Sequence, residues 1–249
     1  MTPASPAVHL VLGASGGIGQ AVAHELASRG DRLVLAGRDA ERLEELAGPL
    51  GADAEPVDAR EPEAVKEVAV GALKRHGRLD GIVNCVGSLL LKPAHRTSVE
   101  EWDDTLATNL RSAFATVSAA ATTMRKQGGS VVLMSSAAAR LGMANHEAIA
   151  AAKAGVMGLT LSAAATYAAY GIRVNAVAPG LVRTPLTASL TRNEAQAKAS
   201  EAMHPLGRLG TPEDVARAIV WLLDPHQSWL TGQVIGVDGG LATVRSRRA

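Results

Sequence analysis

The residues that most clearly indicate a binding site are the glycines of the stretch GASGGIG, residues 13–19. They stand between an apolar run, residues 8–12, and a helix-like segment that starts at Gln20. The N–H groups at a helix N-terminus, together with the helix dipole, favour a phosphate. Only glycine permits both the tight turn and the close approach of the backbone to that phosphate. The position of the stretch therefore predicts a site for a dinucleotide pyrophosphate.

The histidines and the single cysteine do not occur at the spacing of a metal or disulfide site. The histidines are scattered along the chain, so we expect no metal site. A single cysteine, Cys85, excludes an internal disulfide and fits a reducing, cytoplasmic location. With 25 Lys and Arg against 24 Asp and Glu, the net charge of +1 gives no electrostatic basis for nucleic-acid binding. The basic residues Arg245, Arg247 and Arg248 are interpreted as a solvated C-terminal tail.

Short apolar runs alternate with longer amphipathic segments, and these elements must position the glycines. The runs that few charges interrupt are predicted to be strands buried on both faces. They are residues 8–12, 33–36, 81–84, 130–135, 173–177 and 233–237. Helices are predicted to begin at Pro62, at the capping box of Ser98 with Glu101, and at Thr211. The order predicts a single α/β domain over residues 1–249, a doubly wound parallel sheet flanked by helices on both faces.

Membrane and secretory segments are not expected. The Ala-rich stretch 147–170 is interrupted by Lys153 and by glycines, and no stretch approaches the length of uncharged apolar residues that a span needs. No basic region precedes the first apolar run, so we expect no secretory signal.

The glycine spacing G-x-x-x-G-x-G resembles that of the classical short-chain dehydrogenase/reductase (SDR) family, and the resemblance continues through the whole chain. Residues that match family motifs are Asp58 after PV, Asn84 and Gly87 in NCVG, Asn109 in TNLRSAF, Ser136 in VLMSSAAA, Lys153 in AAAKAG, and Pro179, Gly180 and Thr184 in PGLVRT. The ending, from PLGRLGTPEDVA to WLTGQVIGVDGG, is also similar to that of the family. The resemblance implies a Rossmann-type fold, a nicotinamide cofactor and an alcohol or carbonyl substrate.

The resemblance also implies roles for these residues. Ser136 would hold the substrate oxygen, Asn109 would support a water relay, and Asp58 would contact the adenine. The stretch from Pro179 to Thr184 would meet the nicotinamide. The full set expected to bind the cofactor is Gly13, Ser15, Gly17, Ile18, Gly19, Arg38, Asp58, Asn84, Gly87, Lys153, Pro179, Gly180 and Thr184.

The end of the second strand bears on the choice between NAD and NADP. Family members that prefer NAD generally carry an acidic residue where this chain has Gly37. Such a carboxylate would bind the ribose 2′-OH and repel a 2′-phosphate. Here Arg38 could pair with the phosphate instead, although it could equally be a solvated loop cation. Asp39 is better explained as the N-cap of the next helix, so the sequence favours NADP over NAD.

The chain departs from the family at the catalytic tyrosine. Counting back four residues from Lys153 gives Ile149, which cannot transfer a proton, and no tyrosine stands near it. His146 lies three residues before Ile149, and on a helix it would share a face with Ile149 and Lys153. Because an imidazole is a competent proton donor near neutral pH, His146 is a candidate replacement, or it merely starts the helix or lines the pocket. Lys153 would bind the nicotinamide ribose alone or also relay the proton.

Three functions follow from these observations. The first is an NADP(H)-dependent oxidoreductase that acts on a small alcohol or carbonyl substrate with a non-standard proton donor. The second is a catalytically silent NADP(H)-binding homologue, and the third is a lyase or isomerase that reuses the pocket. The resemblance implies that residues 184–208 form the substrate lid. Leu186, Leu190 and Met203 could be its apolar face, although any amphipathic helix would show the same spacing. The resemblance further implies a homotetramer or a dimer, formed through the helices that carry Asn109 and Lys153.

Overall fold

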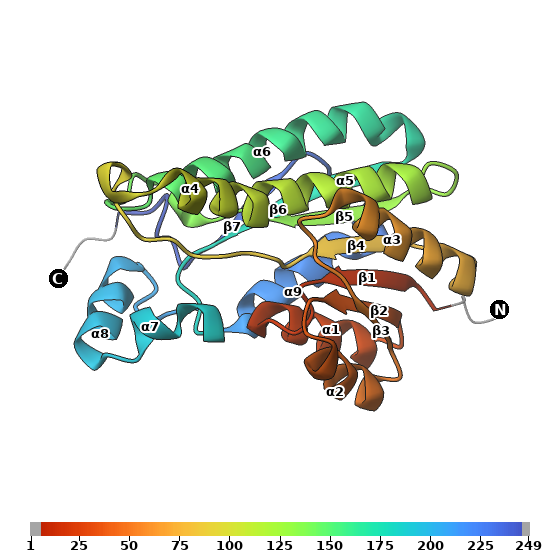
Figure 1. Ribbon diagram of the computed structural model, residues 1–249, viewed down its shortest axis with the longest axis horizontal. Coiled ribbons are helices and arrows are strands. Elements are labelled where there is room, and N and C mark those ends of the chain that lie inside the picture. The colour runs from red at the N-terminus through yellow and green to blue at the C-terminus, as the bar shows by residue number, and fades with distance from the viewer. Residues whose placement is uncertain (1–5, 246–249) are drawn as a thin grey trace.

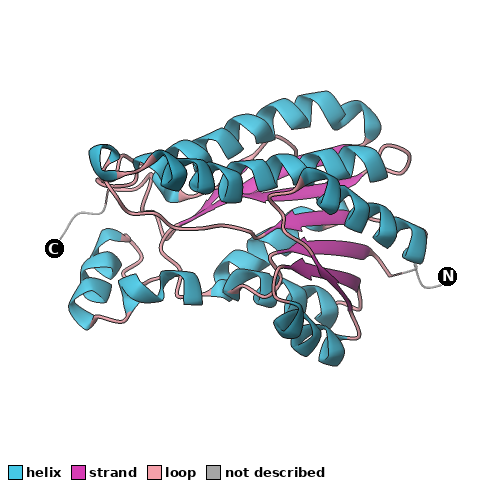
Figure 2. Cartoon of the chain, viewed as in Figure 1, coloured by secondary structure: helices cyan, strands magenta, loops and turns pink. Residues whose placement is uncertain are grey.

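A parallel sheet of seven strands lies between two layers of helices in the computed structural model, which describes residues 6–245 (Figures 1 and 2). The strand order is β3-β2-β1-β4-β5-β6-β7, and every neighbouring pair is parallel. The predicted doubly wound sheet is therefore confirmed. The strands are β1 (Val8–Leu12), β2 (Arg32–Gly37), β3 (Asp53–Pro56), β4 (Gly81–Asn84), β5 (Gly129–Met134), β6 (Ile172–Pro179) and β7 (Val234–Val237). Beyond Arg245, the basic tail expected from the sequence lies outside the described residues, as do the first five residues of the chain.

One strand was missing from the sequence-based expectation. β3 has the sequence DAEP, and its residues are half-buried or exposed. It pairs with β2 alone, at the edge of the sheet. An edge strand has no continuous apolar run, because one of its sides is free and its faces are only partly covered. The six strands that were predicted form, with ends shifted by at most two residues.

The helices begin where the sequence places their caps. Pro62 occupies the first turn of α3, and the capping boxes of Ser98 with Glu101 and of Thr211 with Asp214 both form. Asp39 caps α2, as expected, by accepting from the N–H of Arg42 at 3.2 Å. The helices are α1 (Gly17–Ser28), α2 (Ala40–Leu50), α3 (Pro62–His76), α4 (Val99–Leu106), α5 (Ser112–Thr123), α6 (Glu147–Tyr167), α7 (Ala188–Thr191), α8 (Glu194–Met203) and α9 (Pro212–Leu223).

Alternate residues of the strands point to opposite faces of the sheet and so build two cores. Leu10 and Leu12 of β1 pack on the face covered by α3, α5 and α6. Val11, between them, packs on the face covered by α1, α2 and α9. Both faces are buried, so the strands are apolar throughout, which is the pattern that the sequence displays.

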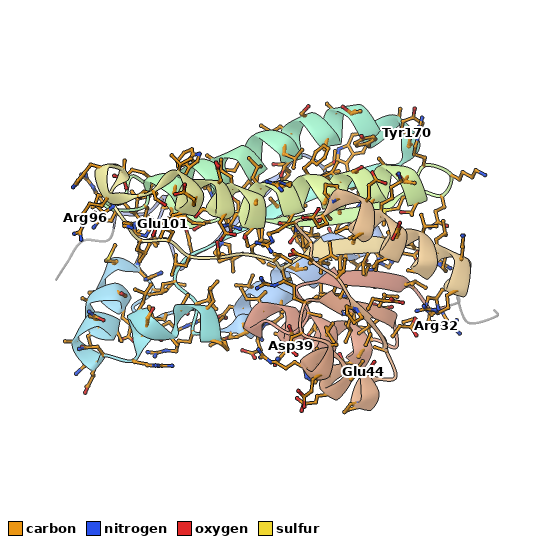
Figure 3. The ribbon with its side chains drawn as sticks, viewed as in Figure 1. Arg32, Asp39, Glu44, Arg96, Glu101 and Tyr170 are labelled. Carbon is orange, nitrogen blue, oxygen red and sulfur yellow. The ribbon has the colours of Figure 1, made fainter. Side chains whose placement is uncertain are left out.

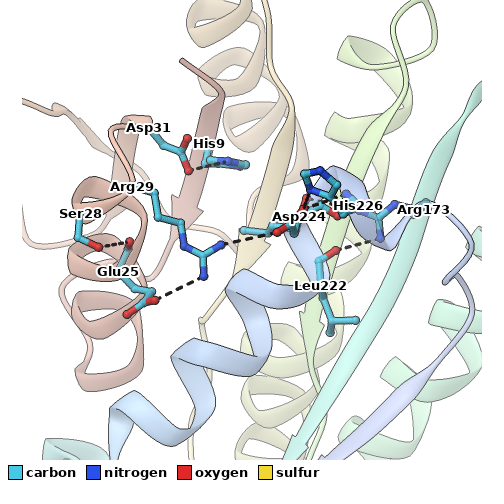
Figure 4. A network of polar contacts seen from close by, with 10 residues as sticks. His9, Glu25, Ser28, Arg29, Asp31, Arg173, Leu222, Asp224 and His226 are labelled. Atoms are coloured by element: carbon cyan, nitrogen blue, oxygen red, sulfur yellow. Dashed lines mark hydrogen bonds and ion pairs between the residues drawn. The ribbon is translucent and has the colours of Figure 1, made fainter. Parts of the chain in front are cut away.

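The amino ends of the strands are closed by polar contacts (Figure 4). His9 of β1 lies 3.4 Å from the carboxylate of Asp31, and Arg29 pairs with Glu25 at the end of α1. The guanidinium of Arg173 in β6 donates to the carbonyl of Leu222 at 2.9 Å and to other carbonyls at the end of α9. The contacts of His9 and Arg173 join these strands to the loop after α1 and to the end of α9, at the amino ends of the strands. The glycine-rich turn lies at the opposite, carboxyl ends of the strands.

Helix α6 crosses the whole molecule and carries Lys153 into the site. Among the described residues, the stretch Glu147–Tyr170 is the one helix long and apolar enough to cross a membrane by length and composition, with a mean hydropathy of 1.5. A core helix of a globular domain meets the same criterion, and this one contributes Val156 and Ala163 to the core beside β5 and β6. Helices α7 and α8 stand apart from the main helix layers, beyond the carboxyl ends of the strands (Figure 1).

Candidate active site

The glycine-rich turn joins β1 to α1 and has the form of an anion cradle. Gly13 has φ +75°, and a Cβ there would lie 2.9 Å from the backbone of Cys85 and Val86. A Cβ on Gly19 would overlap the carbonyl oxygen of Gly13. The N-cap residue of α1, Gly16, has no side chain to satisfy the first N–H groups of the helix. Those N–H groups therefore fit the pyrophosphate of a dinucleotide.

Two arginines lie at the end of β2 beside this turn. Arg38 is exposed and follows the buried Gly37 directly. Arg42, one turn into α2, donates from its guanidinium to the carbonyl of Ser15 at 3.1 Å. The carboxylate of Asp39 is engaged as the cap of α2. The strand end where a ribose 2′-phosphate would lie thus presents two cations, and sequence reasoning found only Arg38.

Asp58 and Asn84 both make contacts within the protein. The Asp58 carboxylate accepts three hydrogen bonds from Arg60, and this pairing first, with a smaller contribution from Arg38, lowers the pKa of that carboxyl. Asn84 is 2% exposed, and its amide donates to the hydroxyls of Ser112 and Thr116. Its side chain fixes the turn after β4, so Asn84 would reach a cofactor through its backbone.

A cavity of about 480 Å³ opens at the carboxyl ends of β4, β5 and β6. It gathers the four residues expected to be catalytic, Asn109, Ser136, His146 and Lys153, together with Ile149. Of the residues expected to bind the cofactor, those that line it are Ile18, Gly87, Lys153, Pro179, Gly180 and Thr184. Gly13, Ser15, Gly17, Gly19, Arg38, Asp58 and Asn84 lie outside it. The cavity and the glycine-rich turn are therefore neighbouring parts of one candidate site.

Ser136 is free to donate a hydrogen bond into this cavity. It follows β5 and caps a short 3₁₀ turn, where its Oγ accepts from the N–H of Ala138 at 3.2 Å. Because Oγ is the acceptor in that bond, its own proton remains available for a substrate oxygen. The neighbouring Ser135 is buried and donates to the carbonyl of Lys153 at 2.9 Å. Ser135 is therefore structural, as expected.

Lys153 is the charged centre of the cavity. Its side chain is buried, and Nζ donates to the carbonyl of Met134 at 2.8 Å, which leaves further donors free. Burial lowers the pKa of Lys153 to about 8, so its ammonium releases a proton much more readily than usual. Burial likewise raises the pKa of the Cys85 thiol to about 12, against the opposing effect of the Lys153 charge. A Cβ on Gly87 would lie 3.6 Å from Nζ, so a larger residue there would crowd Lys153.

Asn109 stands on a π-helical turn, Ala107–Arg111, between α4 and α5. Such turns insert a residue into a helix and are frequent at functional sites. The Asn109 amide donates to the carbonyl of Thr105 and to the Ser88 hydroxyl, each at 2.9 Å. Its Oδ1 accepts from the N–H of Ser88 at 3.2 Å. Ser88, which also lines the cavity, therefore helps to fix the orientation of the Asn109 amide.

His146 does not lie on a helical face, because α6 begins at Glu147 and His146 is its N-cap residue. It nevertheless lines the cavity together with Ile149 and Lys153. Its Nδ1 lies 2.7 Å from the carbonyl of Ala144, which makes Nδ1 the donor and leaves Nε2 bare. Ile149 is 3% exposed. No tyrosine is among the described residues that line this cavity.

The two tyrosines of the chain lie at or near the far end of α6. Tyr170 carries the guanidinium of Arg125 4.3 Å above its ring, and Tyr167 packs against the core (Figure 3). Neither tyrosine lines the cavity, and both make packing contacts instead.

The wall opposite α6 is formed by the end of β6 and by residues 184–208. Thr184 lies against the glycine-rich turn, since a Cβ on Gly17 would be 3.1 Å from it. Leu186, Leu190 and Met203 line the cavity from the turns and helices α7 and α8 of this segment. His204, which the sequence left unassigned, is buried against the same wall. The contact of His204 with Leu181 joins residues 23 positions apart, so no local pattern could have revealed it.

Comparisons with known proteins agree with this architecture. Residues 13–242 match the sequence profile of the family described as enoyl-(acyl carrier protein) reductase. The chain is 35% identical over 237 residues to the 3-oxoacyl-(acyl-carrier-protein) reductase FabG of Vibrio cholerae, covering 94% of this chain and 96% of that protein.

Two solved structures are similar over almost the whole chain. A short-chain type dehydrogenase/reductase from Mycobacterium ulcerans has a TM-score of 0.92 at 32% identity, covering 96% of this chain and 90% of that one. A variant of actinorhodin polyketide ketoreductase with NADPH has a TM-score of 0.90 at 28% identity, covering 98% and 100%. The chain belongs to the classical short-chain dehydrogenase/reductase family of oxidoreductases.

Proposed function

We propose that this protein is an NADP(H)-dependent oxidoreductase that interconverts a carbonyl and an alcohol, with a proton donor other than a tyrosine. The observation that carries the proposal is the convergence of Ser136, Asn109 and Lys153 on one cavity, which Ile149 also lines and no described tyrosine does. Bound NADPH supplies the hydride. Ser136 holds the substrate oxygen through its free Oγ–H, and reduction is completed by a proton that this oxygen receives.

A replacement proton donor must be a titratable residue that lines the cavity. Those described are Cys85, His146, Lys153 and His204. The thiol of Cys85 has a pKa raised to about 12, and both ring nitrogens of His204 are engaged by backbone groups. His146 and Lys153 remain. Lys153 would donate from its Nζ ammonium, and His146 would donate from Nε2 in its imidazolium form, because Nδ1–H is held by the Ala144 carbonyl. Loss of general acid–base catalysis typically costs ~10²–10⁴-fold in rate, so a replacement donor has a large effect to supply.

The preference for NADP is supported by the end of β2. Arg42 donates to the carbonyl of Ser15, Arg38 directly follows Gly37, and Gly37 leaves no carboxylate to repel a 2′-phosphate. Each cation could form charge-assisted hydrogen bonds to that phosphate. The relative solved with NADPH supports the same cofactor.

The substrate is proposed to be an uncharged, apolar carbonyl compound. Lys153 is the one Lys, Arg, Asp or Glu among the described residues that line the cavity. The walls are otherwise apolar or neutral, with leucines and methionines contributed by several segments: Leu89, Leu91, Met143, Leu186, Leu190, Met203 and Leu241. A substrate carboxylate would have only Lys153 to pair with, at the reacting end, so aliphatic or alicyclic ketones and aldehydes fit better.

The test is NADPH oxidation against ketones, aldehydes and quinones, with wild type and Ile149→Tyr assayed together. We expect wild type to form alcohol stoichiometrically with NADPH consumed, and His146→Ala or Lys153→Met to reduce kcat by at least tenfold, according to which residue donates. His24→Ala, which removes an exposed histidine on α1, is the matched control. Turnover that is unchanged in both His146→Ala and Lys153→Met would exclude both donors.

Ile149 also favours a second candidate, a catalytically silent NADP(H)-binding protein. In that case wild type would bind NADPH without turnover, and Ile149→Tyr would gain activity. A lyase or isomerase would convert its substrate while the NADPH spectrum stayed unchanged. The same panel therefore separates the three functions.

We further propose that the protein is cytoplasmic and assembles into a tetramer or dimer. The lone, half-buried Cys85 fits a reducing compartment. Assembly is supported by Phe114 of α5 and Leu161 of α6, which are 52% and 59% exposed on the outer helix layer.

A further inference from the structure

His204 is buried at the point where the lid segment, residues 184–208, meets the end of β6. It follows α8 directly and is 4% exposed. Its Nδ1 lies 2.7 Å from the carbonyl oxygen of Ser200, one turn back in α8. Its Nε2 lies 3.2 Å from the backbone nitrogen of Leu181. The ring therefore bridges the last turn of the lid helix and the wall of the cavity.

The two contacts fix the tautomer of the ring. The Leu181 N–H can only donate, so Nε2 must carry a lone pair. The Ser200 carbonyl can only accept, so Nδ1 must carry the hydrogen. The neutral ring protonated on Nδ1 satisfies both partners at once. A proton transfer through either nitrogen would break one of these bonds, which makes His204 unsuited to act as an acid or base.

The wall that His204 holds is packed closely on both sides. A Cβ on Gly180 would lie 2.7 Å from Nε2 of His204 and 3.1 Å from the backbone of Asp238. The Gly180 N–H donates to the carbonyl of Val237 at 3.2 Å. The backbone at Gly180 and Leu181 is thus clamped between the imidazole and the end of β7.

This wall continues towards the glycine-rich turn. Val182 lines the cavity and bridges Gly210, and Thr184 lies against Gly17. Ser136 and Lys153 come from β5 and α6, on the other side of the cavity. A change at His204 should therefore displace the substrate-facing wall while leaving the groups that act on the substrate oxygen in place.

We propose that His204 is a positioning residue, which couples lid helix α8 to the Gly180–Leu181 wall and so sets how tightly the carbonyl substrate is held. This inference rests on the proposed oxidoreductase function for its kinetic readout. Without the ring acceptor, the Leu181 N–H is left unpaired in a half-buried position. We expect a rise of about tenfold in KM for the carbonyl substrate, which corresponds to ~1.4 kcal/mol.

Three substitutions at this position separate the two hydrogen bonds. His204→Gln can place an amide oxygen near the Leu181 N–H and restore that bond. His204→Asn can reach only the Ser200 carbonyl, and His204→Leu keeps the volume without polar atoms. We expect KM to rise about tenfold in the Asn and Leu variants and to stay within about threefold of wild type in the Gln variant, with kcat within about threefold throughout. His24→Leu is the control, because His24 is exposed on α1.

A second measurement does not depend on turnover. Amide hydrogen exchange of the peptide covering residues 178–187 should accelerate in His204→Leu and return towards wild type in His204→Gln. Equal exchange in these two variants, or a Gln variant as impaired as the Leu variant, would overturn the proposal. A fall in kcat with unchanged KM would also overturn it. If no carbonyl compound is reduced while exchange changes as expected, the proposed function fails and the link between lid and wall stands.

Discussion

At the residue scale, the burial of Lys153 has a consequence for stability. Its pKa is lowered by burial to about 8, whereas the unfolded chain holds that proton up to the ordinary value of 10.5. Between these two values the unfolded state binds more protons than the native state, so the free energy of unfolding rises with pH. Below pH 8 both states are protonated, and the cost of the buried charge is present in full.

Lys153→Met should therefore stabilise the apo protein at pH 7 by roughly 3 kcal/mol, at ~1.36 kcal/mol per pKa unit. It should also remove the rise in stability between pH 8 and 10.5. Urea unfolding of both proteins across this range measures the difference. A difference between the two proteins that does not change with pH would show that Lys153 titrates normally.

The position of Arg38 at the end of β2 predicts that its removal changes the cofactor preference. Arg38→Ala should weaken NADPH binding by about 10–100-fold, the range expected for one lost hydrogen bond to a charged group, and leave NADH binding within about twofold. Fluorescence titration with each cofactor measures both constants. Arg32→Ala is the matched control, because Arg32 is an exposed arginine at the opposite end of the same strand (Figure 3). Parallel losses for both cofactors would place the 2′-phosphate elsewhere.

At the element scale, α4 depends on its capping box. The Ser98 hydroxyl accepts from the N–H of Glu101 at 3.2 Å, and the Glu101 carboxylate accepts from the N–H of Ser98 at 2.9 Å. Lys92 also donates to that carboxylate. Ser98→Ala should lower the free energy of unfolding by about 1 kcal/mol, the usual cost of removing an N-cap side chain.

Chemical denaturation of Ser98→Ala against Ser28→Ala provides the measurement. Ser28 ends α1 and is exposed, and its hydroxyl donates to a carbonyl rather than satisfying a helix-start N–H. Equal stabilities of the two variants would mean that α4 frays at its start in solution.

Most of these elements could be predicted from the sequence, because each carries its own local signal. Apolar runs gave six strands, and the caps gave the helix starts at Pro62, Ser98 and Thr211. β3 could not be found, since an exposed edge strand has no apolar period. The sequence left open whether His146 lies on the face of α6 or starts that helix, because helix register alone does not fix where a helix begins.

The site residues were predicted less completely than the helices and strands. Residues within motifs, such as Ser136 and Lys153, were found and lie in the cavity. Arg42 and Ser88 were not assigned a role, because each acts through a backbone or amide partner on another element. Such contacts depend on how elements dock, which no single segment of the sequence records.

At the scale of the whole molecule, the outer face of α5 and α6 predicts the assembly state. Leu161 of α6 is 59% exposed and Phe114 of α5 is 52% exposed, and large apolar side chains left exposed on helices can mark interaction surfaces. Leu161→Glu should shift the protein to smaller species in sedimentation velocity. Leu206→Glu, at a 73% exposed leucine in the lid segment, should leave the distribution unchanged. A wild type that is monomeric at micromolar concentration would contradict the proposed oligomer.

The all-parallel sheet also bears on how the chain reaches its fold. No neighbouring strands can form a hairpin, and β1 pairs with β4 in a register that joins His9 to Gly81. Sheet formation must therefore await contacts between distant segments, whose loop-closure entropy opposes them. Apolar strands such as β5 would meanwhile be exposed to neighbouring chains. We expect refolding to be slow and its yield to fall as protein concentration rises, while the folded sheet, once its two faces are covered, unfolds rarely.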